Sequence, residues 1–272
     1  AWSHDVGKGA SGKFAHLIPQ VIGTRLFAAD AQGLLQAFDT GAGAPLWTQK
    51  TGYRFVAGPG AGNGQILMGT LDGEVLAFDE LTGEQRWVTA LQSEVLATPV
   101  QSAGRVIART VDGRVFGMKA DDGELEWEFT REAPALTLRG LSDPVVRDGS
   151  AIIGLDTGHV VSLDTRTGEA EWEQVIREAT GRTELERIVD VDAQLLVDDG
   201  RLFTASFGGE VVVLSAISGR ELWRRNLNTY TGMAVFGDQA YVTDLAGTVW
   251  ALDVSSGAAV WSTDECSYRG RS

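Results

Sequence analysis

One pattern occurs six times along the 272-residue chain, and it limits the possible folds more than any other feature. Each copy runs from a glycine to a tryptophan 14 residues later, with a second glycine four residues before the tryptophan, as in "GEVLAFDELTGEQRW" at 73–87. The tryptophans that close the copies are Trp47, Trp87, Trp127, Trp172, Trp223 and Trp261. Six copies without an insertion inside the motif indicate a repeat architecture.

Each copy contains a strand, a hairpin and the start of a second strand. The apolar run at 75–78 predicts a strand with both faces covered. The "TG" or "SG" dipeptide places Gly83 and its equivalents where a tight hairpin needs a positive φ angle. The tryptophan then supplies a large flat anchor against a neighbour. Two further strands precede each copy, such as "ATPV" and "RVIARTVDG", which makes four short antiparallel strands per repeat.

Four strands at intervals of 40, 40, 45, 51 and 38 residues are typical of the blades of a β-propeller. A β-sandwich does not carry a tryptophan at this interval, and a helical solenoid would show a helical period. The sequence therefore predicts an all-β fold, a single β-propeller domain over residues 1–272 with six four-stranded antiparallel blades. Trp2 resembles the tryptophan of a blade whose other strands do not precede it, so we expect an orphan strand near Trp2. We therefore expect the chain to be cut from a longer propeller. The alternative, a native six-bladed ring, leaves Trp2 without a blade.

Charge and composition restrict the class of partner. The formal net charge of −14 argues against nucleic acid and against anionic lipid as ligands. The sequence contains no run of about 18 apolar residues, so it predicts no membrane-spanning helix. The single cysteine, Cys266, excludes an internal disulfide and a multi-cysteine metal site.

The sequence contains no complete motif for phosphate binding, metal binding or nucleophilic catalysis. "GKGASGK" at 7–13 matches most of a phosphate-binding loop, but Phe14 stands where the hydroxyl residue is needed, so we predict a glycine-rich surface loop. His4, His16 and His159 lack metal-ligand spacing. We identify no nucleophile with a histidine partner. The sequence therefore predicts no catalytic residues, no cofactor and no metal site, and a protein that is not an enzyme.

Two intervals between repeats are longer than the rest. They contain "REAPALTLRGLSDP" at 131–144 and "IREATGRTELERIVDVDAQ" at 176–194. Both insertions follow a tryptophan strand and precede the first strand of the next blade, so we expect them on the same face of consecutive blades. Long loops on one face of a rigid repeat scaffold are common binding elements.

The two insertions carry the candidate partner-binding residues. The first has Leu136 and Leu138 beside Arg139, a composition found in interface hot spots. The second has Asp190 and Asp192, which could pair with a basic partner or orient Arg139. The alternative is that the leucines fill a local core and the charged groups are solvated. We predict that these five residues bind a protein partner.

The motif A-x-D-x-x-[ST]-G-x-x-x-W resembles the repeat of the quinoprotein-like propellers, and "PALTLRGLSDP" with "EATGRTELERIVDVD" resembles two loops of the BamB family of outer-membrane assembly lipoproteins. The resemblance implies an eight-bladed, non-catalytic scaffold, lipid-anchored at the periplasmic face of the outer membrane. It implies binding to the POTRA domains of BamA through Leu136, Leu138 and Arg139, with Asp190 and Asp192 beside them. Unfolded outer-membrane proteins are a second class of expected partner.

The chain also departs from this family. It lacks the lipidated N-terminal cysteine and two C-terminal blades, so membrane attachment is inferred from the resemblance alone. The alternative function is a quinoprotein dehydrogenase, which shares the tryptophan repeat. Many such enzymes carry adjacent cysteines near the quinone, and they need a carboxylate-rich Ca²⁺ pocket that we do not locate. A sensor or adaptor propeller would need a fused domain. We therefore expect the scaffold.

Overall fold

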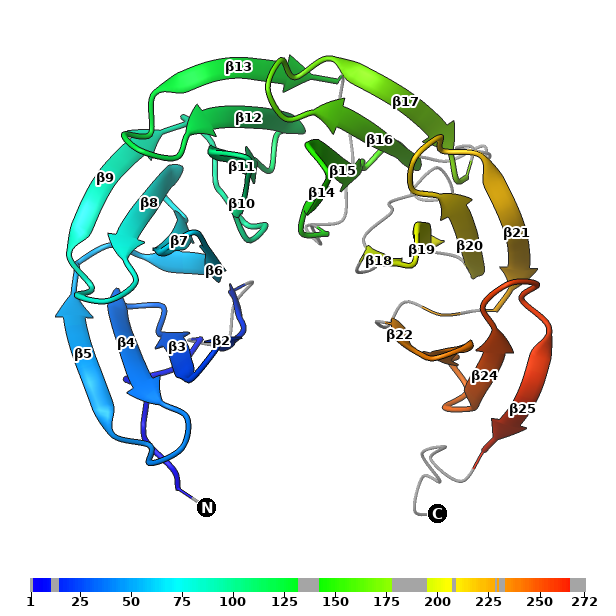
Figure 1. Ribbon diagram of the computed structural model, residues 1–272, viewed down its shortest axis with the longest axis horizontal. Helices are drawn as coiled ribbons and strands as arrows, with labels where there is room; N and C mark the ends of the chain where they lie inside the picture. The colour runs from blue at the N-terminus through cyan, green and yellow to red at the C-terminus, as the bar shows by residue number, and fades with distance from the viewer. Residues whose placement is uncertain are drawn as a thin grey trace. The chain divides into compact units, whose positions relative to one another are not determined.

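The computed structural model describes residues 2–10, 15–131, 142–177, 195–206, 209–227, 229 and 233–264. Over these residues the chain forms strands and turns, arranged in six sheets, and contains no helix. Accordingly, this part of the chain holds no helix that could span a membrane. The expected all-β fold is confirmed, with strands at the positions that the repeats predict (Figure 1).

The sheets follow one another along the chain, and neighbouring strands within each repeat are antiparallel and consecutive in sequence. The first sheet comprises β2 (Gln20–Ile22), β3 (Arg25–Ala29), β4 (Leu34–Asp39) and β5 (Pro45–Lys50). The second comprises β6 (Phe55–Gly62), β7 (Gln65–Thr70), β8 (Glu74–Asp79) and β9 (Gln85–Ala90), joined by β1 (His16–Leu17). The third comprises β10 (Val100–Ser102), β11 (Arg105–Arg109), β12 (Arg114–Lys119) and β13 (Leu125–Thr130).

The last three sheets repeat this order (Figure 1). The fourth comprises β14 (Val145–Arg147), β15 (Ser150–Gly154), β16 (His159–Asp164) and β17 (Ala170–Val175). The fifth comprises β18 (Leu196–Asp198), β19 (Arg201–Ser206), β20 (Glu210–Ser215) and β21 (Glu221–Asn226). The sixth comprises β22 (Met233–Phe236), β23 (Gln239–Thr243), β24 (Val249–Asp253) and β25 (Ala259–Thr263).

Burial explains why the third strand of each sheet is apolar on both faces. Residues 75–78 of β8 are buried on both faces, as their continuous apolar pattern predicts. The fourth strand instead alternates, with Trp87 buried between exposed neighbours in β9. In all six sheets the ladder between the third and fourth strands shifts register beside the tryptophan, for example between Ala77 and Phe78. This bulge follows the residue pair that contains the tryptophan, here Ala77 opposite Trp87.

The N-terminal segment makes two contacts that the repeat pattern does not contain. Strand β1 pairs with β6 in parallel, with His16 opposite Ala57, and adds a fifth strand to the second sheet. Strand β6 has eight residues, so its free edge is long enough to need covering. Residues 2–6, where we expected an orphan strand around Trp2, do not form a strand, although Trp2 stacks on Phe38 of β4.

The chain forms two compact units. The first comprises Ala1–Glu132, Val146–Ala151 and Asp164–Glu169, and the second comprises Ala133–Val145, Ile152–Leu163 and Ala170–Ser272. Each unit has its own apolar core between sheets. In the first unit, Leu67 and Val75 of the second sheet pack in one cluster with Val106 and Phe116 of the third.

Candidate partner-binding site

The predicted binding residues Leu136, Leu138, Arg139, Asp190 and Asp192 lie outside the described residues. Their role therefore stays a prediction. The described residues before and after each insertion show how the chain enters and leaves it.

Both insertions occupy the connection from the fourth strand of one sheet to the first strand of the next, from β13 to β14 and from β17 to β18. Because the strands of a sheet are antiparallel, this connection starts at the same end as the turn between the second and third strands. Hydrogen bonds confirm this, since the first residue of the connection donates its N–H to the carbonyl of the turn glycine. These pairs are Thr51–Gly33, Leu91–Gly73, Ile176–Gly158 and Leu227–Gly209, with N···O distances of 2.7–2.9 Å. We call this the connection end of each sheet.

The second insertion is anchored on both sides by apolar side chains. Ile176, which precedes it, is 1% exposed, and Leu195, which follows it, is 4% exposed. Both belong to one core cluster of the second unit, which also contains Leu202 and Val212. Because the chain is buried immediately before and after residues 178–194, the two flanks of the insertion are fixed by core packing.

An arginine of the following sheet holds the first of these flanks. Arg224 of β21 donates from Nη1 to the carbonyl oxygen of Ile176 at 2.8 Å and to Oε2 of Glu210 at 2.7 Å. It donates from Nη2 to Oε2 of Glu221 at 2.8 Å. The hydrogen bond to Glu221 is the main cause of a raised pKa for Arg224, with a smaller contribution from Glu210. The guanidinium is therefore held in its charged form between two carboxylates.

Sequence reasoning missed Arg224, although a signal was present. The residue that follows the tryptophan is an arginine in this copy of the repeat and in no other. In the other copies the position is occupied by Thr48, Val88, Glu128, Glu173 and Ser262. A positively charged group found at this position in one repeat only, in the blade that follows an insertion, would have pointed to Arg224.

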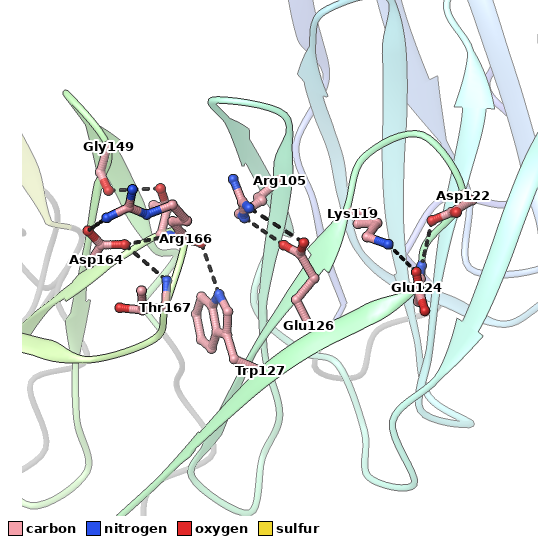
Figure 2. Close-up of polar contacts among 11 residues, drawn as sticks. Arg105, Lys119, Asp122, Glu124, Glu126, Trp127, Gly149, Asp164, Arg166 and Thr167 are labelled. Atoms are coloured by element: carbon pink, nitrogen blue, oxygen red, sulfur yellow. Dashed lines mark hydrogen bonds and ion pairs between the residues drawn. The ribbon is translucent and has the colours of Figure 1, made fainter.

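The opposite end of each sheet, which we call the hairpin end, carries the contacts between sheets. The indole N–H of each docked tryptophan donates to a carbonyl in the next hairpin. These pairs are Trp2–Thr40, Trp47–Glu80, Trp87–Ala120, Trp127–Thr165 and Trp223–Val254, at 2.8–3.0 Å. Figure 2 shows Trp127 against the hairpin that contains Asp164 and Thr167. Trp2 thus makes the contact expected of a blade tryptophan.

The hairpin glycine is required for two reasons at this contact. Gly123 has a φ of +74°, which favours glycine, as the sequence predicts. A Cβ atom on Gly123 would also lie 2.5 Å from the indole ring of Trp87. The hairpin end is therefore filled by the fold's own contacts, which leaves the connection end as the place where inserted residues can be presented.

The glycine-rich loop at 7–10 packs on the first sheet. The amide of Lys8 donates to Oδ2 of Asp30 at 3.0 Å, and the carbonyl of Gly9 accepts from Ala31 at 3.0 Å. Burial acts to raise the pKa of Asp30, but hydrogen bonds from the amides of Lys8, Leu34 and Gln32 outweigh it and lower the pKa. The carboxylate of Asp30 therefore already accepts the hydrogen bond from the Lys8 amide, which a bound phosphate would need.

The described histidines also have protein partners. His4 stacks on Phe38 with ring centroids 5.0 Å apart, and Nδ1 of His159 lies 2.6 Å from Oε1 of Glu173. Within the residues that the structure describes, no group of three or more His, Cys, Asp or Glu side chains could hold a metal ion.

Comparison with known proteins adds the family. A family model described as outer membrane protein assembly factor BamB matches residues 2–263. A protein of that name from Alkalilimnicola ehrlichii is 49% identical, over 97% of this chain and 69% of the relative. Another from Pseudomonas aeruginosa is 47% identical over 98% of this chain and 70% of its own length. One from Escherichia coli is 34% identical over 99% of this chain and 71% of the relative.

Solved structures give the same fold. The crystal structure of BamB from Moraxella catarrhalis matches with a TM-score of 0.85 and 26% identity, covering 93% of this chain and 77% of the other. A quinohemoprotein alcohol dehydrogenase from Comamonas testosteroni matches with a TM-score of 0.73 and 14% identity, covering 93% of this chain and 61% of the enzyme. At that identity the likeness shows the fold alone. The six sheets are therefore propeller blades, which confirms the predicted fold class.

Proposed function

The chain belongs to the BamB family of outer-membrane protein assembly factors, and on that premise we propose that it is a non-catalytic scaffold subunit of the outer-membrane β-barrel assembly complex. Its proposed partner is the array of periplasmic POTRA domains of BamA, with unfolded outer-membrane proteins as a second class of partner. Its proposed location is the periplasmic face of the outer membrane, held by an N-terminal lipid. The observation that carries the proposal is the 49% identity to a named assembly factor over 97% of the chain.

The separation of the two ends of the sheets supports this function. The hairpin end is filled by tryptophan contacts between sheets, whereas the connection end carries both insertions. A rigid scaffold that presents loops from one end of its sheets is suited to binding another folded domain. In the proposed contact Leu136 and Leu138 dock in an apolar groove of the partner, and Arg139 pairs with a carboxylate.

Similarity to the quinoprotein enzymes does not support a second function. The alcohol dehydrogenase from Comamonas testosteroni matches this chain at 14% sequence identity, and that likeness extends only to the fold. Function in a propeller depends on the residues placed on it, since one fold hosts many activities. This likeness therefore does not support the alternative function of a quinoprotein dehydrogenase.

Binding to a purified BamA POTRA array tests the proposal. The wild-type protein and Arg139→Glu are compared by surface-based kinetics, with circular dichroism to match their folding. Reversing the charge of a central interface arginine is expected to weaken binding about 30-fold or more, equivalent to about 2 kcal/mol.

Arg166→Glu is the matched control. Arg166 lies in the hairpin between β16 and β17, at the hairpin end of the fourth sheet (Figure 2). Its side chain is 72% exposed and lies 3.8 Å from Asp164, so its replacement perturbs little of the fold. Its affinity for the array should equal that of the wild type. Failure of the folded wild type to bind, or equal losses in both variants, would contradict the proposed function.

A further inference from the structure

An asparagine followed by a glycine forms the turn between β6 and β7. Asn63 and Gly64 have φ angles of +47° and +79°, and the flanking Gly62 and Gln65 are partners in the ladder. A two-residue hairpin turn of this kind needs a positive φ at both central residues, and Asn-Gly is its preferred sequence. The sequence contains two other asparagines, which are followed by leucine and threonine. Asn63 is therefore the only asparagine in the sequence that precedes a residue without a Cβ atom.

The pair that suits the turn is also chemically reactive. The backbone nitrogen that follows an asparagine can attack the side-chain amide carbon, and a Cβ atom on the following residue hinders this attack. Asn63 is exposed, and no described residue accepts a hydrogen bond from the N–H of Gly64. A Cβ atom built on Gly64 would meet nothing within 4 Å, so this side of the turn is open. Base and water therefore reach both reacting groups.

The reaction exchanges ammonia for water. The nitrogen of Gly64 loses its proton to base and bonds to Cγ of Asn63, and the side-chain nitrogen takes up a proton and leaves as ammonia. This closes a five-membered succinimide ring, in which the backbone carbonyl carbon and Cγ of residue 63 share one nitrogen. Water then adds to one of these carbons and breaks its bond to the nitrogen, which gives aspartate or isoaspartate. In isoaspartate the backbone runs through Cβ and Cγ, so the turn is longer by one atom.

Two other repeats show that the aspartate product fits the turn. Asp148 in the fourth sheet and Asp199 in the fifth occupy the equivalent position, with φ angles of +50° and +42°, and a glycine follows each. The carbonyls of these glycines accept hydrogen bonds from hairpin amides of the same sheets at 2.8 and 2.9 Å. An aspartate with its ordinary backbone linkage at position 63 should therefore leave the turn unchanged. Only the isoaspartate form alters the length of the backbone.

The turn supports the joint between the first and second sheets. The carbonyl of Gly64 accepts a hydrogen bond from the N–H of Glu80 at 3.0 Å. The carbonyl of Glu80 accepts from the indole N–H of Trp47 at 3.0 Å, and its carboxylate accepts from Nη1 of Arg25 at 2.9 Å. Trp47 and Arg25 both belong to the first sheet. A longer backbone at residue 63 displaces the Gly64 carbonyl and so weakens the support of Glu80.

We propose that Asn63 is a deamidation site, and that its isoaspartate product loosens the joint between the first and second sheets. The inference goes beyond the proposed function, because it concerns the hairpin end and needs no partner. Its only reactants are water and base. The ring imposes its own backbone angles on residue 63, so the turn must open before the ring closes. An exposed turn at the end of a hairpin opens at small cost.

Incubation of the purified protein at mildly alkaline pH tests the site. Peptide mapping by mass spectrometry measures conversion at each asparagine, and labelling by an isoaspartate methyltransferase measures the isoaspartate. Asn63 should convert no more than about tenfold more slowly than a synthetic peptide of residues 60–67. Asn226, which precedes a leucine, should convert at least about tenfold more slowly than Asn63. A larger difference from the peptide, or equal conversion at the two asparagines, would overturn the inference.

Gly64→Ala is the matched control for the chemistry. Its added Cβ atom faces open space, so the variant should fold, which circular dichroism checks. The methyl group hinders attack by the backbone nitrogen, so conversion of Asn63 should slow about tenfold or more. Equal rates in the variant and the wild type would show that the reaction does not pass through the nitrogen of Gly64.

Thermal unfolding tests the effect on the joint. The converted protein carries an added negative charge, so ion exchange separates it from the unmodified chain, and labelling verifies its isoaspartate content. The Tm of the isoaspartate form should be about 2–4 °C lower, which corresponds to the loss of one hydrogen bond. Asn63→Asp supplies the aspartate form, and its Tm should lie within about 1 °C of the wild type. Equal Tm values for the isoaspartate form and the unmodified protein would overturn the effect on the joint.

Discussion

The two ends of the sheets differ in how much variation they allow. At the hairpin end a tryptophan, a glycine and a carbonyl meet in the same way in one repeat after another, with indole N···O distances of 2.8–3.0 Å. At the connection end the chain segments between sheets differ from short turns such as 51–54 to the insertion at 176–194. The contacts between a tryptophan and the next hairpin, and the strand ends from which the two insertions start, are thus at opposite ends of the strands.

The physical reason lies in the number of contacts that each end must keep. The hairpin glycine has no space for a Cβ atom, and the indole must reach a carbonyl in the next sheet, so the spacing within the motif cannot change. At Thr51, Leu91, Ile176 and Leu227 a connection starts with a hydrogen bond to the turn glycine of its own sheet, and further contacts hold some of these starts, such as Arg224 on the carbonyl of Ile176. After that bond its length is free, and loops of any composition can be added.

Removing a docked indole is expected to produce the largest effect. Trp87 is 7% exposed, lies over Gly123 and donates to Ala120. Trp87→Ala should lower the free energy of unfolding by about 3–5 kcal/mol, measured by urea denaturation. Its neighbour Val88 is 43% exposed, and Val88→Ala should cost at most about 0.5 kcal/mol. Similar losses in both variants would contradict the special role of the hairpin end.

A methyl group on the hairpin glycine should have the next largest effect. Gly123→Ala adds a Cβ atom that collides with Trp87 and imposes a positive φ on alanine, so we expect a loss of about 2–4 kcal/mol in unfolding free energy. Gly64 also has a positive φ, of +79°, but faces open space. Gly64→Ala should therefore cost only about 1 kcal/mol. If the two losses are equal in urea denaturation, the backbone conformation alone explains the glycine.

The indole hydrogen bond itself can be measured by comparing two tryptophans. Trp127 donates to the carbonyl of Thr165, whereas the buried Nε1 of Trp172 has no acceptor among the described residues. Trp127→Phe leaves a carbonyl without its donor, while Trp172→Phe removes an unsatisfied group. Trp127→Phe should therefore lower the unfolding free energy by about 1 kcal/mol more than Trp172→Phe. The opposite order would show that the ring contact dominates at both sites.

The smallest effect concerns the aspartate that closes the hairpin. Arg86 lowers the pKa of Asp79 to about 2, assisted by the amides of Thr82 and Leu81. Because this pKa is below the unfolded value of 3.8, the stabilisation is present above about pH 4 and is lost as the pH falls towards 2. Asp79→Asn should reduce the loss of stability over that range by less than about 1 kcal/mol, since Asp79 is solvent-accessible. Identical acid unfolding curves for both proteins would contradict this assignment.

Much of the hairpin end could be predicted from local sequence. The burial of residues 75–78 on both faces of their strand and the positive φ of Gly83 follow from patterns within a few residues, and the structure confirms both. The binding residues in the two insertions were predicted from the same repeats, as departures from them. Leu136, Leu138, Arg139, Asp190 and Asp192 stay predictions that the binding experiments address.

The sequence by itself determined the blade, because alternation and turn chemistry act between residues that are close along the chain. Only the tertiary structure decided which carbonyl each indole reaches, that β1 joins β6, and that Arg224 holds Ile176. Trp87 and its acceptor are 33 residues apart, and Arg224 and its acceptor 48. The acceptor in each case is a backbone oxygen, which every residue possesses. A contact made to such a group leaves no mark on the sequence at the accepting position.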